Sequence, residues 1–378
     1  GGLPAWLLTL RDPPLRAIRT NDPAFTAAVT RWWKTLLPTV RPMLWENGGP
    51  VVMVQIENEY GAFAGAGAAA PTAAETAYKS LLISLARELL GPTALIFTTD
   101  GDRLPEMRRG SFNDSRVYSA PDFGPGDPGF RGVAEMVQAA AALRAMNPAG
   151  KAPLLCSEFY SGWATHWGQN VPTATSTQWL VGNLSTWLQF TNAAAANGHQ
   201  RLSASVNLYM AHGGSTVGWW GGGDADAQPD GRCIENYTSY TASYDFNAPI
   251  DEAGGHGIGS DSADKFAAIR ALLAPITHPP PEPPPLPRRS YGVVQMAAAS
   301  RPLTALATLQ ALVPTGAVTS IAPRPMEDIG ALYGFALYEA TLPVPANNNT
   351  ENRQLTIAGG ARDRVIALIN GKRVATVW

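Results

Sequence analysis

The sequence has few cysteines, no phosphate-binding loop and no recognisable metal-ligand spacing. Its 378 residues include only two cysteines, Cys156 and Cys233, which is too few for a disulfide framework. The two cysteines could pair with each other, because both lie near segments assigned below to one site, or stay separate as buried thiols; both alternatives remain open. No Gly-rich loop precedes a predicted helix, so we expect no nucleotide cofactor, and no Cys/His spacing is typical of a zinc site, so we expect no metal.

Charge and long apolar runs are also scarce. Charged residues make up 15% of the chain, and the formal net charge is −2. Nucleic-acid-binding proteins usually carry a strongly basic face, so we expect no nucleic-acid partner. No stretch approaches the roughly 20 apolar residues of a membrane-spanning helix, so we expect no membrane span. The sequence carries no signal for the oligomeric state.

Four Asn-x-Ser/Thr sequons are present, at Asn113, Asn183, Asn236 and Asn348. Four sequons in one chain favour a protein of the secretory pathway, and we expect it in the lysosome or vacuole or outside the cell. The chain opens inside a motif and without a methionine, so we expect the natural start to lie further upstream.

Amphipathic helices alternate with short apolar strands along most of the chain. The predicted helices cover residues 22–37, 72–90, 133–146, 175–197 and 262–275, and the predicted strands cover 50–56, 94–98, 116–119, 153–157 and 204–209. Asp22 and Pro23 suit the start of the first helix and Pro38 its end, while Thr72 and Glu75 form a capping box.

This alternation predicts an α/β protein with a parallel sheet. Each predicted strand ends in polar or aromatic residues, which is typical of a (β/α)8 TIM barrel, where the chemistry lies at the carboxyl ends of the strands. A closed barrel has eight strands and five are visible, so we expect three to lie before Gly1. Residues 1–278 would then supply strands four to eight, without the first three βα units.

A different pattern follows the barrel portion. Residues 279–290 are rich in proline, which predicts an extended linker and a domain boundary. Residues 291–378 contain short β-rich runs, such as 333–338, and a hairpin signal at Asn370-Gly371. We expect the start of an all-β domain here, sandwich-like or jelly-roll-like, that the chain leaves unfinished at Trp378.

Two glutamates stand directly after predicted buried strands. Glu59 lies in the segment QIENEYG and Glu158 lies in CSEFYSGW. Retaining glycosidases use two carboxyl groups roughly 5–5.5 Å apart, one as proton donor and one as nucleophile. The aromatic and amide neighbours of both glutamates suit a sugar site, since rings pack on the apolar face of a hexose. The alternative is that both glutamates cap helices or form ion pairs.

The longer motifs resemble glycoside hydrolase family 35, the β-galactosidases that include a lysosomal animal enzyme and plant relatives. The similar stretches occur in order along the barrel portion and are GGLPAWLL, NGGPVVMVQIENEYGAF, LIFTTDG, SEFYSGWATHWG, SVNLYMAHGGS and SYDFNAPIDEAGG. The resemblance implies a retaining glycosidase that releases terminal β-D-galactose by double displacement, with a β-galactoside as its carbohydrate partner and no cofactor or metal.

The resemblance also implies a role for individual residues. Glu59 matches the general acid/base and Glu158 matches the nucleophile. Four further residues match positions that bind the galactose: Asn58, Tyr160, Tyr209 and Tyr244.

The sequence departs from the family pattern in two motifs and in length. Phe246 and Asn247 replace a Tyr and an Asp that the family usually has, and the segment from His212 to Trp220 differs from the usual HGGTNFGFW. Family members carry about three βα units before GGLPAWLL. We therefore interpret the chain as truncated at both ends, and expect it to be unstable and inactive on its own.

Several other polar and aromatic residues need an interpretation. We expect Glu57 to form an ion pair, on the face opposite Asn58. Asp100 and Asp122 either cap loops or line the pocket, and capping is favoured. The two histidines, His166 and His212, are expected to form hydrogen bonds in loops or in the pocket. A tryptophan cluster could provide sugar platforms or core, and comprises Trp163, Trp167, Trp219 and Trp220.

Two rival functions remain open. Another retaining β-glycosidase of the same barrel clan would place the same two glutamates, and a panel of galactosides, glucosides and mannosides would separate the two enzymes. A non-catalytic carbohydrate-binding fragment is the alternative from a different class. Binding of galactose without product formation would favour it.

Overall fold

The computed structural model describes residues 3–65, 71–124, 146–147, 154–167, 169, 175–195, 204–215, 222–227, 233–244, 248–282, 289–295, 317–341, 356 and 364–377. The helix predicted at 133–146 lies outside these residues except for its last position. Trp219, Trp220, Phe246 and Asn348 also lie outside them, as do residues 283–288 of the proline-rich linker.

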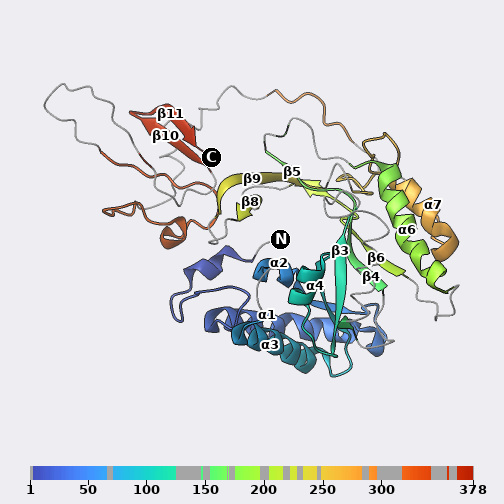
Figure 1. The fold of residues 1–378 in the computed structure, drawn as a ribbon. Coiled ribbons are helices and arrows are strands. Elements are labelled where there is room, and N and C mark those ends of the chain that lie inside the picture. Colours follow the sequence, from blue (N-terminus) through green and yellow to red (C-terminus); the bar gives the residue numbers. More distant parts are fainter. Residues whose placement is uncertain are drawn as a thin grey trace.

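Five parallel strands form the main sheet, in the order β1-β2-β3-β4-β6. Their bounds are β1 Val54–Asn58, β2 Ile96–Gly101, β3 Val117–Phe123, β4 Leu154–Tyr160 and β6 Ala204–Tyr209. Helices follow most of the strands, and Figure 1 shows them on the outside of the sheet. The predicted α/β class with a parallel sheet is therefore confirmed.

The helices pack in two groups. Helix α1 (Pro23–Val40) lies beside α3 (Ala73–Leu90), and α6 (Thr177–Ala195) lies beside α7 (Lys265–Thr277). The short helices α2 (Tyr60–Ala64) and α4 (Leu104–Gly110) contact each other near the ends of β1 and β2.

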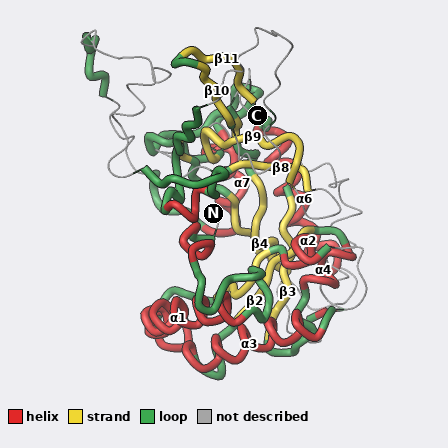
Figure 2. Tube along the Cα trace, turned by 90° about the vertical axis from the view of Figure 1, so that its left-hand side faces the viewer, coloured by secondary structure: helices red, strands yellow, loops and turns green. Residues whose placement is uncertain are grey.

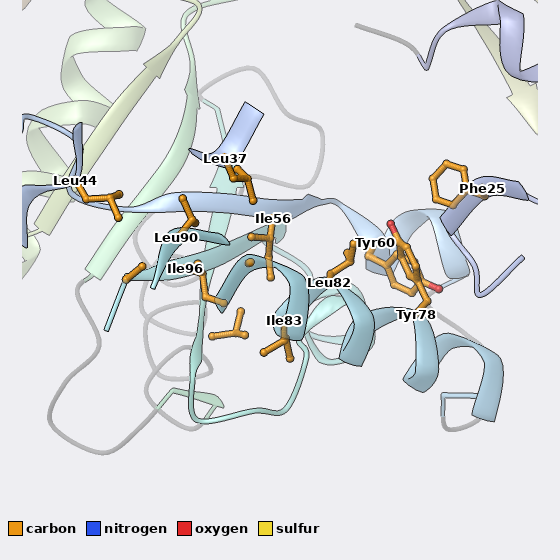
Figure 3. Close-up of a cluster of buried hydrophobic side chains, with 13 residues drawn as sticks. Phe25, Leu37, Leu44, Ile56, Tyr60, Tyr78, Leu82, Ile83, Leu90 and Ile96 are labelled. Carbon is orange, nitrogen blue, oxygen red and sulfur yellow. The ribbon is translucent and has the colours of Figure 1, made fainter. Parts of the chain in front are cut away.

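Each group covers one end of the sheet through its own apolar cluster. The first cluster joins α1 and α3 to β1 and β2, and Figure 3 shows Phe25 and Tyr78 at one end of it and Leu44 and Leu90 at the other. The second joins β3 and β4 to α6 and α7, with Trp187 fully buried at its centre. Burial on this scale supplies most of the stabilisation of an α/β protein.

Local sequence signals account for the helix starts. Asp22 accepts hydrogen bonds from the backbone N–H of Ala24 and Phe25, with Pro23 at the first helical position. The capping box of Thr72 and Glu75 is present in α3. The predicted end at Pro38 is wrong, because α1 runs on to Val40. Proline lacks the N–H that would bond to the carbonyl four residues earlier, but its fixed φ is compatible with a helical backbone, so the last turn continues past Pro38.

The observed strand bounds differ from the predicted ones where hydrogen bonding to a neighbouring strand sets the end of a strand. β1 begins at Val54 rather than at residue 50, because Val51 instead forms a bridge with Leu44. β3 and β4 run three or four residues further than predicted, so Asp122 and Glu158 lie within strands and not in the loops that follow them.

The other described strands form a smaller antiparallel sheet and a hairpin. The smaller sheet pairs β9 (Cys233–Ser243) with β5 (Thr165–His166), β7 (Gly214–Ser215) and β8 (Gly223–Ala227). The hairpin joins β10 (Val365–Ile369) to β11 (Lys372–Val377) through Asn370 and Gly371, both with positive φ, as predicted.

The hairpin lies apart from the parallel sheet in both views (Figures 1 and 2). The run at 333–338 forms no regular strand, so that expectation is wrong. None of the described helices is both long and apolar enough to cross a membrane.

Candidate active site

Four neighbouring strands each place a carboxyl group at the same edge of the parallel sheet. Glu59 follows β1 directly, and the other three are Asp100 on β2, Asp122 on β3 and Glu158 on β4. The carboxyl ends of parallel strands meet at one edge, which is where α/β barrels keep their chemistry. The structure thus brings both predicted catalytic glutamates to this edge.

Glu59 stands at the turn from β1 into α2 with a left-handed backbone, at φ 46° and ψ 41°. A non-glycine residue in this region costs of order 1 kcal/mol or more and persists only when its surroundings hold it. Its N–H donates to the carbonyl of Thr99 at 2.7 Å, and its carbonyl accepts from Phe63. Gly61 packs tightly against α4, and its N–H donates to Asp100 at 2.8 Å.

Amide side chains extend this arrangement on β1. Asn58 Nδ2 donates to Glu59 Oε2 at 3.2 Å, and Gln55 Nε2 donates to Asn58 Oδ1 at 2.9 Å. Asn58 is exposed, so its amide is accessible to a ligand beside Glu59. Asn58 therefore orients one carboxylate and presents its own amide to the same space.

Behind β1, Glu57 forms the expected ion pair. Arg19 Nη2 lies 2.7 Å from Glu57 Oε2, and the same nitrogen donates to the carbonyl of Asn58. The hydroxyl of Tyr78 donates to Glu57 Oε1 at 2.8 Å. Arg19, a residue that the sequence did not single out, thus fixes the backbone one residue before Glu59.

Glu158 and Tyr160 lie two residues apart on β4 and therefore on one face. The Tyr160 hydroxyl donates to Glu158 Oε2 at 3.0 Å. Burial raises the pKa of Glu158, the hydrogen bond from Tyr160 lowers it, and the charge of Glu59 raises it. The two glutamates therefore interact electrostatically across the edge of the sheet.

Four aromatic rings form a closed cycle next to Glu158. The ring centroids of Tyr160 lie 5.7 Å from those of Tyr209 and 5.6 Å from those of Trp163, and Tyr244 lies 5.7 Å from Tyr209 and 6.1 Å from Trp163. Burial and the negative charge of Glu158 raise the pKa of Tyr209 and Tyr244. All three phenols are therefore protonated donors at neutral pH.

Comparisons with known proteins agree with this arrangement. The sequence profile described as "Glycosyl hydrolases family 35" matches residues 1–276. The chain belongs to glycosyl hydrolase family 35. It is 35% identical to "Beta-galactosidase 17" of Arabidopsis thaliana over 93% of this chain and 44% of that protein. It is 35% identical to the "Beta-galactosidase-1-like protein" of Mus musculus, over 98% of this chain and 49% of that one.

The human "Beta-galactosidase" is 33% identical over 98% of this chain and 47% of its own length. The family 35 chain described here thus spans about half the length of the curated relatives it matches. Among solved structures, a broad-specificity endoglucanase from Clostridium acetobutylicum has a TM-score of 0.33 and 10% identity over 66% of each chain, a likeness too low to indicate a shared fold.

The two aspartates of this family 35 site differ from each other. Asp100 caps α2 through Gly61, as expected. For Asp122 the favoured capping role is wrong, because its side chain is 4% exposed and bonds only to the hydroxyl of Thr99 among the described residues. Burial and the charges of Glu59 and Glu158 raise the pKa of Asp122 to about 9. It lies between the two glutamates.

Other residues singled out in the sequence have different surroundings. His166 stacks on Tyr240 with ring centroids 5.0 Å apart, and His212 is exposed. Trp163 belongs to the aromatic cycle, while Trp167 is 68% exposed. Cys156 is a buried free thiol within the described part of the chain.

No group of three metal-ligating side chains occurs among the residues that the structure describes. The described side chains at this edge of the sheet are carboxyl groups, the amide of Asn58 and phenols.

Proposed function

We propose that the full-length protein is a retaining β-galactosidase in which Glu59 is the general acid/base and Glu158 is the nucleophile. The observation that carries the proposal is the placement of both glutamates at one edge of the parallel sheet, within electrostatic reach of each other. Membership of family 35 and relatives named as β-galactosidases support the choice of galactose.

The reaction proceeds in two displacements with retention of configuration. In the first, Glu158 attacks the anomeric carbon while Glu59 gives its proton to the leaving oxygen, and the glycosidic bond breaks as a galactosyl-ester bond forms. In the second, Glu59 removes a proton from water, which attacks the same carbon and releases galactose and the free carboxylate of Glu158.

The electrostatics of the site suit this division of roles. Glu158 must be ionised to attack, and the hydrogen bond from Tyr160 favours its ionised form. The charge of Glu59 raises the pKa of Glu158. Protonation of Glu59 removes that charge, so the state that starts the reaction also favours an ionised nucleophile.

Asn58, Tyr160, Tyr209 and Tyr244 bind the galactose in this proposal. Asn58 is held beside Glu59 by a hydrogen bond and exposes its amide. The rings of the three tyrosines and Trp163 contact one another in a cycle. Together they offer hydroxyl groups and ring faces to one sugar.

The finer domain organisation is part of the proposal. The five strands correspond to strands four to eight of a (β/α)8 barrel, and the first three βα units belong to the full-length protein. The open strand order with β1 and β6 at its ends supports this assignment, as does the greater length of the relatives. Residues 279–290 then form a linker, and residues 291–378 begin a β-rich domain.

The proposed location is the lysosome or vacuole, or the extracellular space. Of the four sequons, Asn113 is exposed and Asn183 is partly exposed on α6, where its amide donates to the carbonyl of Trp179. Exposure of Asn113 is compatible with glycan attachment in the secretory pathway.

The test is hydrolysis of 4-nitrophenyl glycosides by the full-length protein and its Glu158→Gln variant. We expect release of nitrophenol from the β-D-galactoside, at least tenfold faster than from the glucoside or mannoside, and loss of turnover in the variant with galactose binding retained. Faster hydrolysis of another sugar would favour a different β-glycosidase. Galactose binding without turnover by the unaltered protein would favour a binding protein.

A further inference from the structure

Asp122 occupies the middle of the carboxyl edge. It lies on β3, between β2 and β4, and its Cα partner in the register with β4 is Glu158. Register partners on neighbouring strands direct their side chains to the same face of the sheet. Its side chain is 4% exposed, so solvent does not reach it freely.

Hydrogen bonds connect Asp122 to the backbone that holds Glu59. The hydroxyl of Thr99 donates to Asp122 Oδ2 at 3.3 Å, and the backbone carbonyl of Thr99 accepts the N–H of Glu59 at 2.7 Å. The Thr99 hydroxyl also bonds to the hydroxyl of Ser157, the residue before Glu158. Thr99 thus holds the backbone of Glu59 through its carbonyl and contacts Ser157, next to Glu158, through its hydroxyl.

The charged groups around Asp122 are carboxylates. Glu59 faces it from the end of β1, Asp100 from β2 and Glu158 from β4, together with the phenol of Tyr160. Within the described residues no cation pairs with Asp122. An ionised carboxylate in this position would be buried among like charges, with a single neutral hydrogen-bond donor, which is strongly unfavourable.

We propose that Asp122 is a positioning residue that stays protonated and acts as a neutral, hydrogen-bonded spacer between Glu59 and Glu158. The positioning role of Asp122 in catalysis rests on the function proposed above, whereas the protonation of Asp122 does not. A neutral Asp122 leaves the nucleophile as the main negative charge of the site when Glu59 holds its proton. The raised pKa of Asp122 is consistent with this state.

Infrared difference spectroscopy tests the protonation without any need for activity. The pH chosen is 8, between the pKa of Asp100, raised to about 7, and that of Asp122, raised to about 9. The carbonyl band of protonated carboxyl groups should lose the intensity of one group in Asp122→Asn relative to the unaltered full-length protein. Asp114→Asn is the control, because its partner Arg116 lowers the pKa of Asp114, and it should keep the band. A band of unchanged intensity in Asp122→Asn would overturn the proposal.

Kinetics test the positioning role. Asp122→Asn keeps the shape and the neutral charge, so kcat should stay within about threefold and the acidic limb of the pH profile should not move. Asp122→Ala removes the spacer and should lower kcat about 100-fold with KM changed less than about threefold.

Two outcomes would overturn this role. A shift of the acidic limb of Asp122→Asn to lower pH would mean that Asp122 carries a charge in the unaltered enzyme. Unchanged kcat in a folded Asp122→Ala would mean that it positions nothing. If the unaltered protein hydrolyses no galactoside, the proposed function fails, while the infrared result still decides the protonation.

Discussion

The hydroxyl of Tyr160 donates a hydrogen bond of 3.0 Å to Oε2 of Glu158, two residues earlier on the same strand. This bond opposes the effects of burial and of the Glu59 charge on the pKa of Glu158. One phenol therefore helps to keep the proposed nucleophile ionised in a partly buried site that otherwise disfavours its charge.

Removal of this bond should shift the pH dependence of activity. In Tyr160→Phe the pKa of Glu158 rises, because the group that lowered it is gone. Activity requires ionised Glu158 and is lost as the pH falls through its pKa. The acidic limb of kcat/KM should therefore move to higher pH, with kcat reduced about tenfold or more at its optimum.

The matched control is Tyr291→Phe, because Tyr291 is 90% exposed. Its pH profile should coincide with that of the unaltered full-length protein. An acidic limb that stays in place in Tyr160→Phe would contradict the role given to this hydrogen bond.

Arg19 should matter for both stability and activity. It makes two bonds to the carboxylate of Glu57 and one to the carbonyl of Asn58. A lysine cannot reproduce this planar geometry, so Arg19→Lys should lower the free energy of unfolding by about 1–3 kcal/mol and reduce kcat by loosening Glu59.

Arg116→Lys is the control for Arg19→Lys, since Arg116 also binds a carboxylate but its side chain is 55% exposed. In denaturant titrations, Arg116→Lys should change the free energy of unfolding of the protein by less than about 0.5 kcal/mol. Equal losses of stability in Arg19→Lys and Arg116→Lys would contradict a special role for the bonds of Arg19 to Glu57 and Asn58.

A pair of glycine substitutions tests the packing that holds the turn at Glu59. A Cβ at Gly61 would lie 2.0 Å from the backbone carbonyl oxygen of Glu106, so Gly61→Ala must push α2 away from α4. We expect a loss of at least about 2 kcal/mol of stability. Gly182 on α6 has no atom within 4 Å of such a Cβ, so Gly182→Ala should stabilise by about 0.5–1 kcal/mol. Thermal unfolding of both variants checks the prediction.

Stability should depend on pH through Asp122. Its pKa is raised on folding from the ordinary 3.8 of an aspartate to about 9, so the folded form binds a proton that the unfolded form has lost. This contribution is complete at pH values below 3.8 and is lost as the pH rises towards 9. The melting temperature of Asp122→Asn should therefore rise relative to the unaltered protein between pH 5 and pH 9 (a window set by the same pKa change). A constant difference over that window would contradict the raised pKa.

Local signals in the sequence were sufficient for much of the fold. Asp22, Thr72 and Asn370 mark helix starts and a turn through bonds within a few residues, and the structure has each of them. Ends set by pairing between strands were missed, because the residues that pair are far apart in the sequence. The extension of β4 to Tyr160 depends in this way on β6.

The candidate site was partly accessible from the sequence. Glu59 and Glu158 stand in motifs long enough to be recognised, and Glu57 follows from strand alternation. Asp100 and Asp122 give the same local signal, an aspartate near a strand end, yet Asp100 caps α2 through Gly61 whereas Asp122 is the register partner of Glu158. Arg19 belongs to a loop without periodicity, 38 residues from its partner Glu57. The different roles of the two aspartates and the role of Arg19 both depend on tertiary contacts, which local sequence patterns do not show.

The most direct test is to trap the covalent intermediate of the full-length protein with an activated 2-deoxy-2-fluoro-β-D-galactoside. Fluorine at C2 slows both displacements, and a good leaving group lets only the first proceed, so the sugar should stay bound to the nucleophile. Mass spectrometry of the digested protein should find one fluorogalactosyl group, on Glu158. A label on Glu59 or Asp122, or galactose release with inverted configuration and no label, would contradict the account.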